Sequence, residues 1–205
     1  ETFVRNVLVD WLQVSEVWVG ANFLFGRDRA GNFSLLRTLG SRFGFRAEKI
    51  DPVRYKDFVV SSTRIRRLVS EARIDEAAAL LGHQYYLDGT VIEGDRRGRT
   101  LGFPTANVNL QRRQSAVMGI FAVRVRGLAK KPLDAVASVG TRPTFDGTKP
   151  ILEVHIFDFD EDIYGRYIHV DFIERLRDER RFANADALVE QMHRDSQQAR
   201  DVLAA

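Results

Sequence analysis

The residues best suited to chemistry lie in one short segment, residues 94–107, which reads GDRRGRTLGFPTAN. Near its end, Thr105 and Asn107 stand two residues apart, directly after a proline that fixes the chain direction. A hydroxyl and an amide at this spacing can both reach a cation or a phosphate. The segment therefore predicts a nucleotide-phosphate site.

The same segment carries glycines and arginines that suit a bound phosphate. Glycine lets a backbone approach a ligand closely and adopt positive φ. The glycines concerned are Gly94, Gly98 and Gly102. Arginines, here including Arg99, offer forked donors that fit phosphate oxygens. No Gly-Lys-Ser/Thr ending follows, so the segment is not a Walker A loop. A basic surface turn that enters a strand is the alternative that the spacing leaves open.

A carboxylate that could act as a general base lies on a predicted strand, Ile151–Phe159. Apolar and polar residues alternate there, so Leu152 and Val154 share the core face while Glu153 and His155 share the other. A solvated glutamate on an exposed face is the alternative for Glu153. The four histidines of the chain show no metal-ligand spacing, and we expect His155 to pack or to form a hydrogen bond.

Two further clusters could bind anions or cover a ligand. Ser61, Ser62 and Thr63 begin a predicted helix, with Arg66 close behind, and a helix N-terminus of this kind suits an anion. An ordinary helix cap explains the same residues. The charged loop before the last predicted helix holds acids, arginines and an aromatic residue, and it is either a solvated loop or a flap over a site. Its candidate residues are Arg177, Glu179 and Phe182.

The elements that position these residues differ between the two parts of the chain. Up to Gly82, helical and strand patterns alternate. Helices are predicted at residues 1–14, 35–43 and 75–81, with a further helix that starts at 61–63. Strands are predicted at 17–19 and 45–50, and a loop at 20–26 contains Asn22. Strands alternating with helices indicate an α/β unit with a parallel sheet. Ligands of such sheets bind at the carboxyl ends of the strands.

After residue 82 the pattern changes to short runs with a period of two. The predicted strands are Tyr86–Ile92, Gly119–Arg126, Leu133–Val139, Ile151–Phe159 and Tyr167–Ile173. This spacing favours an antiparallel sandwich or small barrel, and residues 184–203 predict a closing helix. The sequence therefore predicts an α+β protein with domains at residues 1–82 and 83–205.

Composition narrows the class of protein further. With 31 basic and 28 acidic residues the net charge is only +3, which suits an anionic small molecule as well as a nucleic acid. No run approaches the ~18–20 apolar residues of a membrane helix. The chain has no cysteine, so thiolate chemistry is excluded and we expect a cytoplasmic location.

Taken in order, the segments resemble the bacterial bifunctional riboflavin kinase/FMN adenylyltransferase family, also called the FAD synthetases. The second part matches that family through GDRRGRTLGFPTAN, SVGTRPTF, LEVHIFDF and LRDERRF, and the first part through GANFLFG and VSSTRIRRL. The resemblance implies a partial, Rossmann-like α/β nucleotidyltransferase domain, followed by a six-stranded antiparallel β-barrel riboflavin kinase domain with a C-terminal helix. It also implies ATP as co-substrate, Mg²⁺, and riboflavin, FMN and FAD as substrates or products.

The resemblance also implies roles for individual residues. Thr105 and Asn107 would bind the Mg²⁺–ATP phosphates, and Glu153 would accept the proton of the riboflavin 5′-hydroxyl. The flap over the nucleotide would contain Gly94, Gly98, Arg99 and Gly102. The flavin-side loop would contain Arg177, Glu179 and Phe182. The adenylyl-transfer site would include Asn22, Ser61, Ser62, Thr63 and Arg66.

One family feature is missing from this sequence. The family's adenylyltransferase domain begins with a segment that carries His-x-Gly-His, and no pair of histidines here has that spacing. The segment would precede Glu1. Riboflavin phosphorylation alone is expected if it is absent from the protein, and both activities if it is present. A basic β-barrel that binds nucleic acid is the alternative from another class, although the cationic residues alternate with acids and no aromatic RNA-binding signature occurs.

Overall fold

The computed structural model describes the chain except for residues 95–97, 99–100, 111–114 and 145–146. Its described residues form two compact units, Glu1–Val60 and Ser61–Ala205. No helix in the described part of the chain combines the length and the apolar character that crossing a membrane would require.

The first unit is a small α/β arrangement. Its elements are η1 (Val4–Trp11), β1 (Glu16–Gly20), β2 (Leu24–Phe25), η2 (Arg27–Arg29), β3 (Gly31–Asn32), α1 (Phe33–Phe43), β4 (Arg46–Ile50), β5 (Arg54–Tyr55) and β6 (Phe58–Val59). Strands β1 and β4 pair in parallel, as the sequence predicts for an α/β unit. Helix α1 begins at Asn32, whose side chain accepts a hydrogen bond from the Leu35 amide at 3.0 Å. The first helix is present but has π-helical hydrogen bonding.

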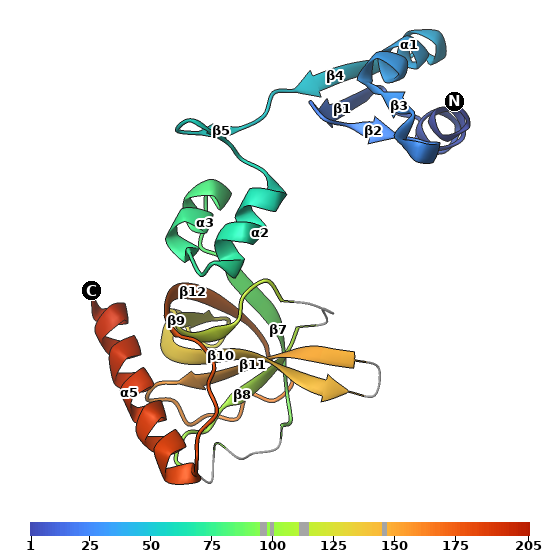
Figure 1. Ribbon diagram of the computed structural model, residues 1–205. Coiled ribbons are helices and arrows are strands. Elements are labelled where there is room, and N and C mark those ends of the chain that lie inside the picture. The colour runs from blue at the N-terminus through green and yellow to red at the C-terminus, as the bar shows by residue number, and fades with distance from the viewer. Residues whose placement is uncertain (95–97, 99–100, 111–114, 145–146) are drawn as a thin grey trace. The chain divides into compact units, whose positions relative to one another are not determined.

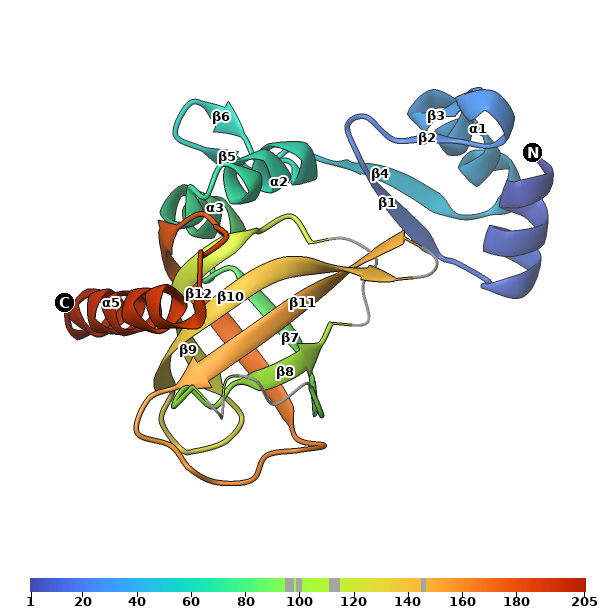
Figure 2. The same ribbon diagram turned by 60° about the horizontal axis from the view of Figure 1, so that its bottom comes forward.

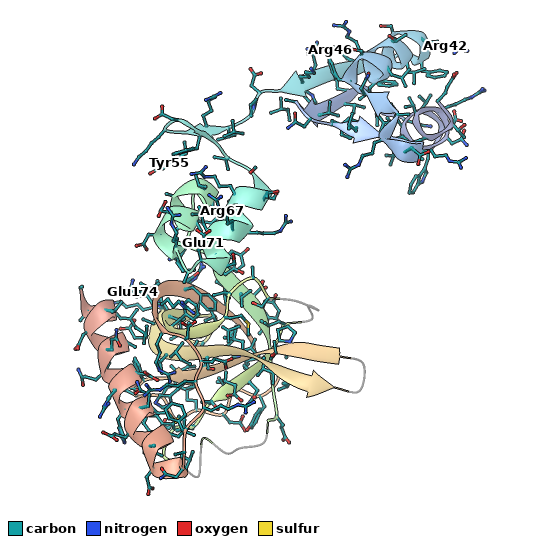
Figure 3. The ribbon with its side chains drawn as sticks, in the orientation of Figure 1. Arg42, Arg46, Tyr55, Arg67, Glu71 and Glu174 are labelled. Carbon is teal, nitrogen blue, oxygen red and sulfur yellow. The ribbon has the colours of Figure 1, made fainter. Side chains whose placement is uncertain are left out.

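The second unit opens with two short helices, α2 (Ser62–Ser70) and α3 (Ile74–Leu81). Helix α2 begins and α3 ends as the sequence predicts: the Ser61 hydroxyl accepts from the Arg64 amide at the start of α2, and Gly82 follows α3 with φ 76°. On the exposed side of α2, Arg67 and Glu71 form an i,i+4 ion pair of 3.6 Å (Figure 3).

Helices α2 and α3 pack on the β-barrel and share its core through Leu68, Val69, Ile74 and Ala77. The compact units therefore divide at Val60 and Ser61, earlier than the domain boundary at 82/83 that the sequence analysis gives. The change of pattern at Gly82 marks where strands begin, whereas packing is decided by the buried apolar faces of the two helices. The assignment of residues 1–82 and 83–205 to two functional domains remains a prediction.

A closed barrel of six antiparallel strands forms most of the second unit (Figure 1). The strands are β7 (Tyr86–Ile92), β8 (Ala106–Asn109), β9 (Gly119–Arg126), β10 (Leu133–Thr144), β11 (Gly147–Ile156) and β12 (Tyr167–Arg177). Around the barrel they follow the order β10-β11-β8-β7-β12-β9. Alternate side chains fill the interior, where Phe121 and Phe172 meet edge to face with ring centroids 5.1 Å apart. The predicted six-stranded barrel is confirmed.

The last helix, α5 (Ala185–Ala204), lies along the outside of the barrel and contacts β9, β10 and β12 (Figures 1 and 2). It begins at Asn184, whose side chain accepts from the Ala187 amide at 2.9 Å. Ala199 and Leu203 of the helix are buried against Ala122 and Phe157 of the barrel. The predicted closing helix is confirmed. Its first half lies outside this buried contact and can form the wall of a cavity.

Candidate active site

The centre of the site is a row of polar side chains across three neighbouring strands. Glu153 of β11 lies directly opposite Asn107 of β8 on one side and opposite Ser138 of β10 on the other. Residues paired in this way have Cβ atoms about 4.5–5.5 Å apart on the same face of the sheet. Leu152 and Val154 are fully buried in the barrel core, so Glu153 faces outward, as the alternation predicts.

The glycines of the segment before β8 leave room for its polar side chains. A Cβ atom on Gly94 would lie 2.2 Å from Nδ2 of Asn107, and one on Gly98 would lie 2.3 Å from the Phe103 carbonyl and 3.2 Å from the Thr105 hydroxyl. The backbone at both glycines therefore sits directly against the residues expected to bind phosphate. Gly102 has φ 83°, which favours glycine, and Arg99 lies outside the described residues.

The end of this segment is held by two histidines. The buried ring of Phe103 contacts the His155 ring at 5.3 Å and the His193 ring of α5 at 4.8 Å between centroids. Nδ1 of His155 lies 2.9 Å from the Pro104 carbonyl, a hydrogen bond in which the ring nitrogen donates. His155 is thus a packing and hydrogen-bonding residue, as expected, and it fixes the backbone directly before Thr105.

Two cavities share Thr105 and Asn107 in their walls. The acidic pocket has a volume of about 280 Å³ and a rim that includes Asp160, Glu161 and Asp162. The helix-side pocket has a volume of about 480 Å³ and lies between the polar row and α5. The residues lining it include Glu153, Ser138, His155, Leu188 and Met192. A ligand in one pocket and a ligand in the other would therefore meet at Thr105 and Asn107.

The predicted flavin-side loop also borders the helix-side pocket, which is lined by Arg177, Glu179 and Phe182. The Arg177 guanidinium lies 5.7 Å from the centre of the Phe182 ring. Sequence reasoning missed the partner of Arg177, which is the buried carboxylate of Asp195 on α5. The signal was present, because Asp195 follows Leu188 and Met192 at helical spacing on an otherwise apolar face.

The residues predicted for adenylyl transfer are not among those that line these two pockets. Ser61, Ser62, Thr63 and Arg66 are exposed at the N-terminal end of α2, in the second unit. Asn22 is exposed in the turn after β1, in the first unit, at the carboxyl end of that strand. Each group is thus placed within its own unit, and their common role remains a prediction.

The described part of the chain contains no group of three or more carboxylate or histidine side chains that could hold a metal ion. Two groups away from the pockets have shifted pKa values. The Arg200 guanidinium lowers the pKa of the Asp158 carboxyl through two hydrogen bonds. Burial lowers the pKa of His169, with Arg126 adding to the effect and Asp171 opposing it.

The second unit is thus a closed antiparallel barrel with a closing helix, and it carries Asn107 directly opposite Glu153. The sequence model described as "Flavokinase: Riboflavin kinase" matches residues 81–203, more than half of the chain. The chain belongs to the riboflavin kinase family. A second model, described as "FAD synthetase", matches residues 1–64. The resemblance stated from the sequence is confirmed.

Individual relatives agree with this assignment. The chain is 42% identical over 201 residues to the bifunctional riboflavin kinase/FMN adenylyltransferase of Escherichia coli, and 38% identical over 200 residues to that of Haemophilus influenzae. These matches take in 98% of the chain but only 64% and 65% of the relatives. A Streptococcus pneumoniae crystal structure described as a macrolide-efflux protein superimposes with a TM-score of 0.74 at 33% identity, over 96% of this chain and 64% of that one.

Proposed function

We propose that the second unit transfers the γ-phosphoryl group of ATP to the 5′-hydroxyl of riboflavin, giving FMN and ADP. The observation that carries this proposal is the pairing of Glu153 with Asn107 at the junction of two pockets. A phosphoryl acceptor and a phosphoryl donor need adjacent sites with a base on the acceptor side. Membership of the riboflavin kinase family supports ATP and riboflavin as the two substrates.

The flavin would occupy the helix-side pocket. This pocket is the larger of the two, and apolar side chains such as Leu188, Met192 and Phe182 can cover a flat aromatic ring system. Glu153, in the middle of the polar row, lines this pocket where the ribityl chain would end. The charged residues Arg177 and Glu179 on the same wall can bind polar groups of the ligand and fix its orientation.

ATP would occupy the acidic pocket, with its phosphates directed toward Thr105 and Asn107. Its base carries an amino group, which would find hydrogen-bond acceptors among Asp160, Glu161 and Asp162. The absence of side chains at Gly94 and Gly98 lets Asn107 and Thr105, the residues that would bind the phosphates, lie directly against the backbone there.

Mg²⁺ would lie with the phosphates at this junction, and the residues fit it. Mg²⁺ takes oxygen ligands, keeps several waters and is often held by few protein groups together with substrate phosphates. The Thr105 hydroxyl and the Asn107 amide oxygen would hold it, because glycines at 94 and 98 keep both side chains uncovered by a neighbouring Cβ. When bound, the ion neutralises negative charge on the phosphates.

Glu153 would act as the general base. Its carboxylate accepts the proton of the 5′-hydroxyl, the hydroxyl oxygen forms a bond to the γ-phosphorus, and the bond to the ADP oxygen breaks. His155 holds the Pro104 carbonyl and so keeps Thr105 in register with Glu153 across the two strands. Positioning of this kind is the main contribution that a protein makes to phosphoryl transfer.

The test is whether the protein forms FMN from riboflavin and ATP-Mg²⁺, with the product measured by chromatography. Glu153→Gln is expected to lower kcat by about 10²–10⁴-fold, the range for general acid–base residues, while riboflavin binding is retained. Glu190→Gln is the matched control, since Glu190 pairs with Arg194 on the exposed side of α5. No FMN from the unaltered protein, or a Glu153→Gln variant with the activity of the control, would refute the proposal.

We propose in addition that the whole protein transfers AMP from ATP to FMN. This second function is supported by the FAD synthetase match over residues 1–64 and by the parallel pair β1–β4, with Asn22 in the turn after β1. Amides at the start of α2 and the Arg66 guanidinium would bind phosphate. Arg66→Ala in the full-length protein is expected to slow FAD formation and to leave riboflavin phosphorylation unchanged; equal loss of both activities would count against it.

A further inference from the structure

A buried carboxylate on α5 has no role in the mechanism above. Asp195 is 4% exposed, and it accepts two hydrogen bonds from Arg177, from Nε at 2.8 Å and from Nη2 at 2.6 Å. Gln191, one turn earlier on the helix, donates a third at 2.7 Å. Both oxygens of Asp195 are therefore fixed by geometry of the kind that gives the strongest ion pairs.

Arg177 is the last residue of β12, and the loop that borders the helix-side pocket begins there. Its Nη1 donates to the Asp178 carbonyl at 2.8 Å, so the guanidinium also holds the first peptide of the loop. Its backbone is equally constrained, because a Cβ atom on Gly119 of the neighbouring strand would lie 2.7 Å from the Arg177 carbonyl. Asp195 thus acts on the loop through Arg177.

The same loop is held from two other directions. The Glu179 carboxylate lies against Gly140 of β10, where an added Cβ would come within 2.3 Å of Oε1. Arg180 pairs with Gln191 of α5, the residue that also donates to Asp195. The loop conformation is therefore tied to the first half of α5 and to one strand of the barrel.

Docking of α5 does not need Asp195. The second half of the helix has its own attachments: Arg200 donates to both oxygens of Asp158 at 2.8 and 3.0 Å, and Arg124 donates to the Leu203 carbonyl at 2.9 Å. A buried ion pair is also weak as a source of stability, since apolar residues of similar volume often serve as well. The Asp195–Arg177 pair fixes the direction of the loop, which apolar packing cannot do.

We propose that Asp195 is a positioning residue for the flavin: it holds Arg177, and through it residues 178–182, in the conformation that forms the wall of the helix-side pocket. The inference rests on the proposed function, because it assigns riboflavin to this pocket. It predicts that loss of Asp195 weakens the binding of riboflavin but not the binding of ATP. The reason is that Asp195 and Arg177 border the helix-side pocket and not the acidic pocket.

The test is the Asp195→Asn variant, which keeps the side-chain volume and removes the charge. The KM and Kd of riboflavin are expected to rise about tenfold or more, as for loss of a hydrogen-bonded charge partner, with the KM of ATP within about twofold of normal. Asp158→Asn is the matched control, because it breaks the other doubly bonded Arg–Asp pair of α5 and should leave both constants unchanged. Riboflavin binding is measured by quenching of its fluorescence.

Two further variants separate positioning from stability. Arg177→Met with Asp195→Leu replaces the pair by apolar side chains, so unfolding temperature should recover relative to Asp195→Asn while riboflavin binding stays weak. Gly140→Ala pushes on the Glu179 carboxylate from the barrel side with the ion pair intact, and it should also raise the riboflavin KM selectively.

Equal changes in the KM of riboflavin and of ATP, the same shift in Asp158→Asn, or normal riboflavin binding by the double variant would overturn this inference. A protein that binds riboflavin and does not phosphorylate it would instead refute the proposed function and leave the positioning of the pocket wall supported by the binding data.

Discussion

The space left at Gly94 gives a sharp test of the site, because a single methyl group there would act directly on Asn107. In Gly94→Ala, the new Cβ would lie 2.2 Å from Nδ2, 2.5 Å from Cγ and 2.7 Å from Oδ1 of the Asn107 side chain. The φ of Gly94 is not in the left-handed region, so alanine causes no backbone strain of that kind. The amide group is the part that must move.

The size of the movement follows from the contact distances. Ordinary contacts begin at 3.4 Å, so the amide must shift by the difference between 3.4 and 2.2 Å, about 1.2 Å. A misplacement of about 1 Å at a reacting centre costs on the order of 10² in rate, which corresponds to about 2.7 kcal/mol of activation free energy. We therefore expect Gly94→Ala to lower kcat for FMN formation about a hundredfold.

Steady-state formation of FMN measures this effect, and thermal unfolding reports whether the fold is intact. Gly20→Ala is the matched control, since nothing lies within 4 Å of a Cβ added at Gly20 and its φ is not in the left-handed region. Both variants are expected to unfold within about 0.5 kcal/mol of the original protein. A Gly94→Ala variant with more than half of the normal kcat would refute the argument that Asn107 takes part in catalysis.

Three other predictions concern stability, pH and the metal. Phe172→Ala removes a fully buried ring and should lower the free energy of unfolding of the second unit by about 3–5 kcal/mol, measured by denaturant titration; a loss under 1 kcal/mol would contradict the packing. Because burial lowers the pKa of His169 below its usual 6.5, the unfolded chain binds its proton more readily. Its neutral form is fully stabilising above pH 6.5, and this contribution is lost as pH falls through the lowered pKa. His169→Gln should flatten that slope in unfolding experiments, and an unchanged slope would refute the assignment. Removal of Mg²⁺ by EDTA should abolish FMN formation while riboflavin quenching persists; activity that survives chelation would exclude the metal.

Local patterns in the sequence were sufficient to predict most of the fold. Alternation with a period of two predicted β7 with its observed bounds, because every second side chain of that strand is buried in the barrel. The bounds of β9 were also predicted correctly, although β9 is buried on both faces because α5 covers its outer side. The starts of the helices at Ser61 and Asn184 were also predicted, since each depends on a hydrogen bond to a residue only three positions away. Strand β8 was missed by this approach, as its four residues are too short a run to show a period.

The site required contacts that no local pattern contains. Thr105, Asn107 and Glu153 were selected by residue type and by family resemblance, but the register that places Asn107 opposite Glu153 is set by the closure of the whole barrel. The hydrogen bond between His155 and Pro104 joins residues 51 positions apart. The sequence shows Asp195 only as a charged residue on an otherwise apolar helix face, and its role becomes clear only when Arg177 is placed beside it.

The most direct measurement is a crystal structure of the protein with riboflavin, Mg²⁺ and a non-hydrolysable ATP analogue. We expect the isoalloxazine ring between α5 and the loop at residues 178–182, the ribityl 5′-hydroxyl within hydrogen-bonding distance of the Glu153 carboxylate, and the γ-phosphate at Thr105 and Asn107. A flavin bound outside the helix-side pocket, or a triphosphate remote from Thr105, would contradict this expectation.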